Sequence, residues 1–89
     1  MLLIECRFIS SILIIYLKNP MDILKKLGSN IREQRTKLDL SQEMLANNAD
    51  IHRTYLGAVE RGEKNVSFKN LYKIAKALKV SVSDLTKLI

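Results

Sequence analysis

Apolar residues recur at intervals of three and four in the segment from about Asp22 to Lys37. The inward positions are Leu24, Leu27 and Ile31, with Leu38 as a further candidate, and the outward positions are Lys25, Lys26, Arg32 and Lys37. A stripe of this period buries one face of a helix and exposes the other. The segment therefore predicts an amphipathic helix packed on a core.

Residues 41–62 predict two short helices joined by a tight turn. Ser41 is of a type that caps helix N-termini, and the apolar face that follows consists of Leu45, Ala46 and Ala49. The helical pattern ends at residues 48–50, where Asn and Asp favour a turn, and Ile51 then supplies an inward apolar contact. His52 stands where a capping residue starts the next helix.

The second short helix has two distinct faces. Leu56 and Val59 face inward, and the outward positions between and before them are Arg53, Thr54, Gly57 and Ala58. Two long or polar side chains followed by two nearly bare positions suit a helix that lies close against base pairs. Two short helices in this arrangement are the geometry with which helix-turn-helix proteins read the DNA major groove.

Two further helices are expected toward the C-terminus. The first begins after Ser67, and its buried face consists of Phe68, Leu71, Ile74, Ala75 and Leu78. The sequence from Ser81 to Asp84 resembles a capping box and opens a short final helix from Val82 to about Leu88. The chain after residue 20 therefore predicts an all-α domain of five helices.

Residues 1–20 form an apolar N-terminal extension, and the helical domain occupies residues 21–89. The uncharged run from Phe8 to Leu17 is about half of the roughly 20 residues needed to span a bilayer, and a small-residue cleavage site is not seen. A membrane anchor or a signal peptide is thus the weaker interpretation. Its isoleucines and aromatic residues favour a strand, with a helix as the alternative. A lone strand needs a second copy or an apolar surface to cover, and the extension is interpreted as optional.

Composition agrees with a small binding domain. The 89 residues suffice for one modest core, and 15 Lys and Arg against 9 Asp and Glu give a net charge of +6, which favours a polyanionic partner. Cys6 is the only cysteine and His52 the only histidine, so neither an internal disulfide nor a metal site is expected. Without a catalytic constellation or a phosphate-binding glycine loop, we expect no enzyme and no cofactor. A reducing cytoplasm is the simplest location.

The region from about Leu27 to Leu85 resembles the phage repressor and Cro family, also called the xenobiotic-response-element family. The matching parts are Leu38–Gln42, Leu45–Ala46, Ile51–Val59, Glu60–Gly62 and Leu71–Leu78. Within that family, His52–Gly57 and Glu60–Ser67 look most like the controller proteins of restriction-modification systems. The resemblance implies a repressor-like fold that binds double-stranded DNA at a pseudo-palindromic operator.

The resemblance also implies roles for individual residues. Arg53, Thr54, Gly57 and Ala58 would contact bases, and Gln42 would hold a backbone phosphate at a helix N-terminus. Arg35 and Glu60 would pair across the unit, fixing the recognition helix and leaving the arginine near phosphate; the alternative is two unrelated surface charges. The other expected phosphate contacts are His52, Tyr55, Arg61, Lys64 and Asn65. The alternatives are a helix cap for His52, a ring packed on the domain edge for Tyr55, and an adjacent groove as the target of the three loop residues. Lys64 stands where controllers often have arginine, and lysine lacks the planar fork for bidentate base contact.

A homodimer is expected to form through an apolar terminal stripe that comprises Val82, Leu85, Leu88 and Ile89. The alternative is that these residues only close the core of one subunit, and Leu85 is expected to contribute to both. A twofold dimer would place two recognition helices about 34 Å apart, one turn of DNA. Two dimers on adjacent sites would follow from the controller resemblance.

The favoured interpretation is a sequence-specific transcriptional regulator, a controller that regulates its own restriction-modification operon. A phage-type or chromosomal repressor would use the same residues. An antitoxin would have a toxin protein as its main partner, and a membrane-associated interaction protein would depend on residues 1–17.

Overall fold

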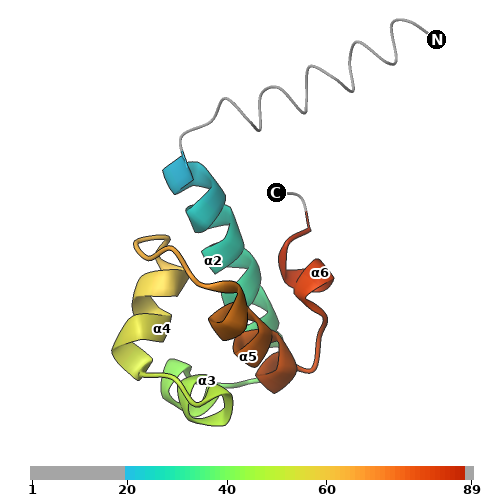
Figure 1. Ribbon diagram of the computed structural model, residues 1–89. Helices are drawn as coiled ribbons and strands as arrows, with labels where there is room; N and C mark the ends of the chain where they lie inside the picture. Colours follow the sequence, from blue (N-terminus) through green and yellow to red (C-terminus); the bar gives the residue numbers. More distant parts are fainter. Residues whose placement is uncertain (1–19, 88–89) are drawn as a thin grey trace, which may run out of the picture.

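The computed structural model describes residues 20–87, which form five helices and no strand (Figure 1). The helices are α2 (Pro20–Lys37), α3 (Gln42–Ala49), α4 (Arg53–Glu60), α5 (Phe68–Leu78) and α6 (Val82–Leu85). This order confirms the all-α, five-helix prediction. The first helix begins two residues before the predicted Asp22, and the last ends at Leu85 rather than near Leu88. The expectations for the N-terminal extension, including Cys6, lie outside the described residues.

Serine side chains start three of these helices. The Ser41 hydroxyl accepts from the Met44 N–H at 3.0 Å, and the Ser67 hydroxyl accepts from the Asn70 N–H at 3.2 Å. Ser81 and Asp84 form the predicted capping box, with both reciprocal hydrogen bonds at 3.0 Å. The backbone N–H of Ser81, donating to the carboxylate, lowers the pKa of Asp84 below its ordinary value. Each cap satisfies N–H groups that the first helical turn leaves without partners.

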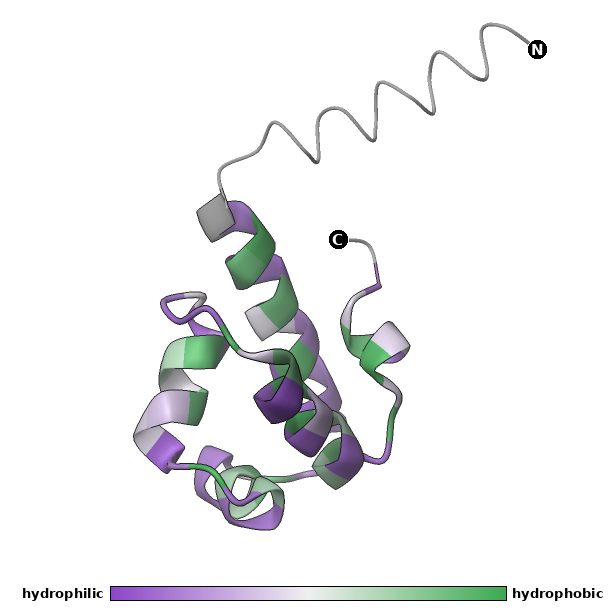
Figure 2. Cartoon of the chain, viewed as in Figure 1, coloured by the Kyte–Doolittle hydropathy of each residue, from purple (hydrophilic) through white to green (hydrophobic). Residues whose placement is uncertain are grey.

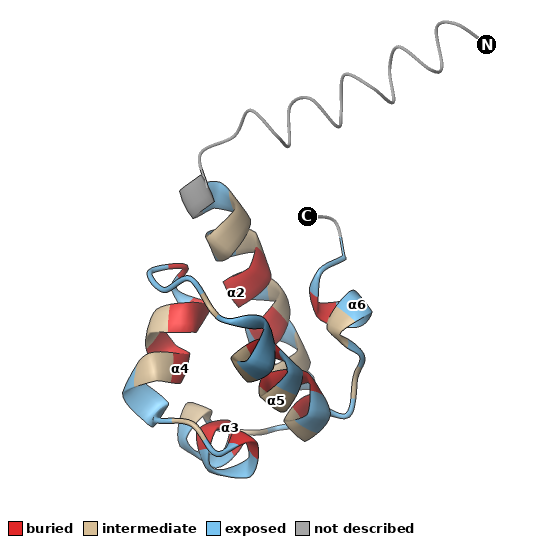
Figure 3. Ribbon diagram, viewed as in Figure 1, coloured by how far each residue is buried: buried red, intermediate tan, exposed pale blue. Residues whose placement is uncertain are grey.

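The core consists of twelve buried apolar residues contributed by all five helices (Figures 2 and 3). They are Leu27, Ile31, Leu45, Ala46, Ala49, Leu56, Val59, Leu71, Ile74, Ala75, Leu78 and Leu85. All but Leu85 were expected on inward faces from helical spacing alone. The spacing thus predicted the core-facing stripe of each longer helix correctly.

Two residues that the pattern assigned to the core are instead exposed. Leu38 is 45% exposed because it follows the last residue of α2, in a turn where Asp39 has a positive φ of 57°. Phe68 is 71% exposed because it is the first residue of α5. Side chains on a helix tilt toward its N-terminus, so at this position the ring extends beyond the helix end rather than onto the core.

The long helix α2 packs against α4, α5 and α6, whereas α3 packs against α4 and α5. The helix α5 also contacts α6. In the view of Figure 1, α4 and α6 lie on opposite sides of α2. The Asn30 side chain on α2 donates to the carbonyls of Leu85 and Lys87 at 2.9 and 3.0 Å, which ties the C-terminal segment to the long helix.

Candidate nucleic-acid interface

The helices α3 and α4 form the expected helix-turn-helix unit, with residues 50–52 as the turn. Asp50 adopts the left-handed conformation at φ 56°, and the Ile51 N–H donates to the Ala46 carbonyl at 3.0 Å. His52 occupies the predicted N-cap position of α4 in an extended conformation, but its side chain makes no capping hydrogen bond. Its exposed imidazole is therefore not held by the helix that follows.

The first turn of α4 projects away from the core. Arg53 and Thr54 are exposed, whereas Leu56 and Val59 are fully buried, as the spacing predicted. Ala58 is half-buried. The freely accessible part of this helix is thus its N-terminal turn, where an arginine and a threonine stand side by side.

Gly57 corrects the expected shape of the outward face, because it is buried rather than bare to solvent. A methyl group at Gly57 would lie 3.2 Å from Nη1 of Arg61 and 3.6 Å from Oε1 of Gln42. The ends of these two side chains therefore cover the glycine. Arg61, the C-cap of α4, lies four residues after Gly57 on the same helix face, whereas the contact from Gln42 of α3 could not be read from spacing along one helix.

Glu60, at the end of α4, lies at the centre of a buried polar network. Its carboxylate accepts from Nε and Nη2 of Arg35 at 2.8 and 3.1 Å, and from Nε2 of Gln42 at 3.0 Å. Arg35 also donates through Nη1 to the Leu40 carbonyl at 2.8 Å. The Glu60 side chain is only 2% exposed, so these partners compensate a charge that would otherwise be costly to bury. The network joins α2, α3 and α4 at one point.

This network limits how Arg35 and Gln42 can meet a phosphate. The Arg35 side chain is 11% exposed, and its Nε, Nη1 and Nη2 atoms each make a hydrogen bond within the protein. Gln42 is half-buried and uses Nε2 for Glu60 while its Oε1 lies toward Gly57. Both residues hold the recognition unit together. The hydrogens left to donate to an anion are one on each Nη atom of the largely buried Arg35, one on the Gln42 amide, and the N–H groups at the start of α3.

Tyr55 is fixed by a residue that the sequence did not single out. The Asn70 side-chain amide donates to the Tyr55 hydroxyl at 3.2 Å, and the ring is half-buried against the core. Because the hydroxyl acts as acceptor in this bond, its own hydrogen remains available to an outside acceptor. The only sequence signal was a polar residue in the first turn of an otherwise apolar helix face.

The loop after α4 carries the remaining expected contacts. Arg61, Lys64 and Asn65 are exposed, and Arg61 forms an ion pair with Glu63. Both side chains of that pair are more than half exposed. The pairing of Glu63 with Arg61 was not predicted, although an acidic residue two positions after an arginine is a visible signal. Any anion that binds Arg61 must compete with this carboxylate.

The expected dimerisation stripe is only partly at the surface. Leu85 is 0% exposed and belongs to the core of one subunit, as expected for one of its two roles, and this burial leaves it no surface for an interface; Val82 is half-buried against that core. Leu88 and Ile89 lie outside the described residues. Two aromatic side chains on α5, Phe68 and Tyr72, are instead 71% and 56% exposed. Since they are four residues apart, they share one face of the helix.

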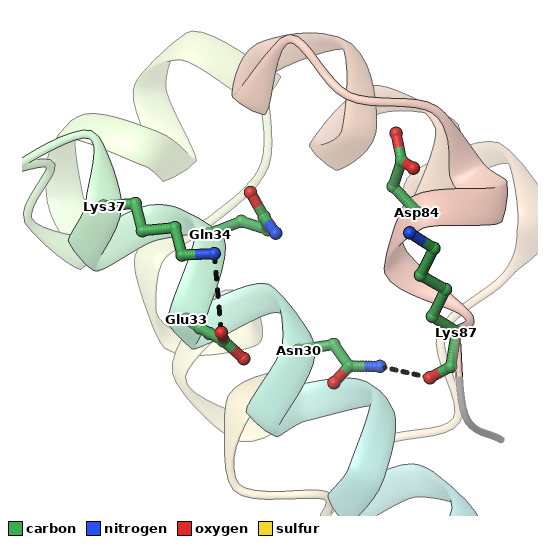
Figure 4. A pocket seen from close by; sticks show the side chains of 6 residues that line it. All are labelled: Asn30, Glu33, Gln34, Lys37, Asp84 and Lys87. Carbon is green, nitrogen blue, oxygen red and sulfur yellow. Dashed lines mark hydrogen bonds and ion pairs between the residues drawn. The ribbon is translucent and has the colours of Figure 1, made fainter.

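A shallow cleft of about 250 Å³ lies between α2 and α6 (Figure 4). Its lining mixes both charge signs and two amides: Asn30, Glu33, Gln34, Lys37, Asp84 and Lys87. The Lys37 ammonium lies 3.5 Å from the Glu33 carboxylate. None of these residues belongs to the helix-turn-helix face. Over residues 20–87, no cluster of three potential metal ligands occurs, and no helix has the length and apolarity to cross a bilayer.

Comparison with known proteins gives a consistent set of relatives. A family model described as helix-turn-helix matches residues 31–85. Control protein C.SmaI from Serratia marcescens is 49% identical over 65 residues, which cover 73% of this chain and 77% of that protein. Control protein C.BamHI from Bacillus amyloliquefaciens is 49% identical over 59 residues, covering 65% and 73%.

A solved structure also resembles this fold closely. The restriction-modification controller protein C.AhdI from Aeromonas hydrophila superimposes with a TM-score of 0.69 at 47% sequence identity. The matched region covers 70% of this chain and 94% of that one. Sequence and structure thus point to the same group of proteins.

Proposed function

The chain belongs to the helix-turn-helix family, and from this premise we propose that it is a sequence-specific DNA-binding regulator that controls a restriction-modification operon. The observation that carries the proposal is the exposed first turn of α4, a helix whose C-terminal end is fixed by the buried Glu60 network. A rigid helix that presents an arginine and a threonine is suited to reading base edges. High identity to named control proteins supports the controller assignment.

In the proposed complex, α4 enters the major groove with its N-terminal turn foremost. Arg53 makes a bidentate contact to a guanine, and Thr54 contacts an adjacent base. Ala58 gives van der Waals contact at most, and Gly57 lets the side chains of Gln42 and Arg61 approach the helix. Base discrimination therefore depends mainly on the first two residues of α4.

Phosphate contacts fix the register of the helix. The exposed candidates on both sides of α4 are His52, Arg61, Lys64 and Asn65, and the half-buried Tyr55 of α4 adds its hydroxyl hydrogen. The start of α3 at Gln42 adds N–H groups that can face a phosphate. Arg35 serves chiefly to hold Glu60. With a net charge of +6, binding should weaken steeply as the salt concentration rises.

The DNA-binding unit in this proposal is residues 21–89, and residues 1–20 are an accessory segment. The buried core and the polar network that the structure describes are formed by residues between Leu27 and Leu85. A protein that begins at Met21 should still bind the operator. Because its proposed partner is chromosomal or plasmid DNA, the protein acts in the cytoplasm.

The active species in the proposal is a twofold dimer on a pseudo-palindromic operator. Leu85 is buried, so the proposed pairing surface within the described residues is the exposed α5 face with Phe68 and Tyr72. The sequence proposal of Leu88 and Ile89 as further contacts concerns residues outside the described part of the chain. Exposed aromatic side chains are the residue types that protein interfaces favour. Two such dimers on adjacent sites would give a cooperative switch.

Selection from a random pool of DNA duplexes tests the proposal. We expect enrichment of a twofold-symmetric sequence with half-sites about 10 base pairs apart. A gel-shift titration on the DNA upstream of the protein's own gene should then pass from one bound dimer to two with little intermediate. Enrichment without symmetry would contradict the dimeric reader. If two sites fill independently, the controller proposal is wrong and a simple repressor is the better interpretation.

A further inference from the structure

Gly28 of α2 lies directly against the main chain at the end of α4. A methyl group at this position would lie 2.4 Å from the Glu60 carbonyl oxygen and 2.5 Å from the Val59 carbonyl oxygen. Distances this short do not occur between real atoms of these types, and the obstacles are backbone atoms of a helical turn. They cannot swing aside as the end of a long side chain can. An alanine at position 28 must therefore move the end of α4 away from α2.

Gly62, just after α4, makes the reciprocal contact: here the glycine follows α4, and the main chain that it approaches belongs to α2. It is buried, has a positive φ of 75°, and a methyl group there would lie 2.8 Å from both the Cα and N atoms of Lys25. The left-handed conformation alone favours glycine, and the backbone contact excludes a side chain independently. Lys25 and Gly28 are one helical turn apart on α2. The two backbones thus fit into each other at two successive points.

The same face of α2 continues to Arg35, seven residues after Gly28, or about two helical turns. Glu60 is consequently held twice, by its main chain at Gly28 and by its carboxylate at Arg35. The free end of α4 carries Arg53 and Thr54. Its eight residues span about 12 Å, so α4 moves as a short rod whose C-terminal end is fixed. A shift at the fixed end carries the two exposed residues with it.

We propose that Gly28 and Gly62 form a glycine seat that positions the recognition helix and thereby sets the selectivity of the protein for its operator. The inference rests on the proposed function in one respect, that α4 reads DNA. Base-edge contacts require alignment to within a fraction of an ångström, whereas flexible lysine and arginine side chains reach phosphates from a range of positions. Displacing α4 should thus weaken operator binding far more than binding to unrelated DNA.

The direct test compares Gly28→Ala with Ser29→Ala, which alters an exposed neighbour on the same helix. Dissociation constants are measured for the selected operator and for an unrelated duplex of equal length at one salt concentration. Gly28→Ala should lose affinity for the operator on the order of tenfold, with about twofold or less change on unrelated DNA. Ser29→Ala should match the wild type on both. Alanine normally stabilises a helix interior relative to glycine, so a Gly28→Ala protein with a higher melting temperature and unchanged operator affinity would overturn the proposal.

Gly62→Ala probes the same seat from the exit turn of α4 and keeps the inference testable if Gly28→Ala does not fold. A folded Gly62→Ala protein with the same loss of selectivity would support the seat. If both variants unfold, the glycines are determinants of folding alone, and the proposal is wrong.

A measurement without DNA separates the seat from the proposed function. In the NMR spectrum of free Gly28→Ala, the amide signals of Arg53 and Thr54 should shift although these residues lie at the other end of α4. Unshifted signals would reject the seat whatever the protein binds. A wild-type protein that fails to distinguish any operator from unrelated DNA would instead reject the proposed function.

Discussion

Glu60 of α4 accepts hydrogen bonds from both Nε and Nη2 of Arg35 in α2, at 2.8 and 3.1 Å. The two residues are 25 positions apart in sequence, and the Glu60 side chain is only 2% exposed. A buried pair of this kind adds little relative to two apolar residues, but removing one partner leaves the other charge uncompensated. The main contribution of Arg35 to stability is therefore that it compensates the buried charge of Glu60.

Arg35→Ala should lower the free energy of unfolding by about 3–5 kcal/mol, because it leaves the buried carboxylate with Gln42 as its single remaining side-chain partner. Urea titration measures the loss. The matched control is Lys37→Ala, which breaks the Lys37–Glu33 pair, in which both side chains are 61% exposed. Its cost should not exceed about 1 kcal/mol. Equal losses of unfolding free energy in the two variants would mean that the buried pair contributes no more to stability than an exposed one.

Leu85→Ala should lower the free energy of unfolding of a single subunit by about 2–5 kcal/mol, as expected for a fully buried leucine. Ser83→Ala, on the exposed side of the same short helix, is the control and should cost little. Urea titration at several protein concentrations distinguishes core from interface. A loss that appears only through weaker dimerisation would place Leu85 back at a subunit contact.

Phe68→Ser should leave the stability of one subunit nearly unchanged, because the ring is 71% exposed. If a second copy covers that ring, the dimer dissociation constant should rise on the order of tenfold or more, which sedimentation equilibrium measures. Lys69→Ala alters the next, exposed residue and serves as the control. If a folded Phe68→Ser protein dimerises as the wild type does, Phe68 is not part of the interface, and the proposed contacts at the chain end would be the ones to test next.

The Asp84 capping box should make the stability of α6 depend on pH. The backbone N–H of Ser81, followed by its side chain, lowers the pKa of the folded carboxyl below its ordinary value of 3.8. A group with a lowered folded pKa contributes stability that is present above the unfolded pKa and is lost as the pH falls through the folded pKa. Asp84→Asn should thus be less stable than the wild type at pH 7, and the difference should shrink below about pH 4. An Asp84 carboxyl that titrates by NMR at or above its ordinary pKa would contradict this.

Much of the fold was predictable because its information is periodic and local. Serine residues at N-cap positions mark the starts of α3 and α5, and spacings of three and four residues predicted Leu56, Val59 and Ile74 as core residues. The exceptions lie at helix ends. Leu38 and Phe68 have apolar side chains, but periodicity does not fix the direction of a side chain at or beyond a helix terminus.

The candidate site was less predictable because its shape depends on contacts between segments. Gly57 was expected to be open, yet side chains from α3 and the exit loop cover it. Asn70 gave only the signal of a polar residue on an apolar helix face, and Gly28 gave none, since a hydrogen bond to Tyr55 and a backbone approach to Glu60 arise only from tertiary packing. Resemblance to a family implied the partnership of Arg35 and Glu60, which spacing along the chain could not have shown.

Arg53 is the proposed reader of bases at the start of α4, and the ratio of operator affinity to affinity for unrelated DNA tests this role directly. Arg53→Ala is compared with Lys87→Ala, which removes the same single charge from the exposed rim of the cleft between α2 and α6. Arg53→Ala should lose about 1–3 kcal/mol of operator binding and relax the preference at one base pair of each half-site. Lys87→Ala should retain the wild-type ratio and base preferences. If a folded Arg53→Ala protein keeps the full ratio and every base preference, the first turn of α4 does not read the operator.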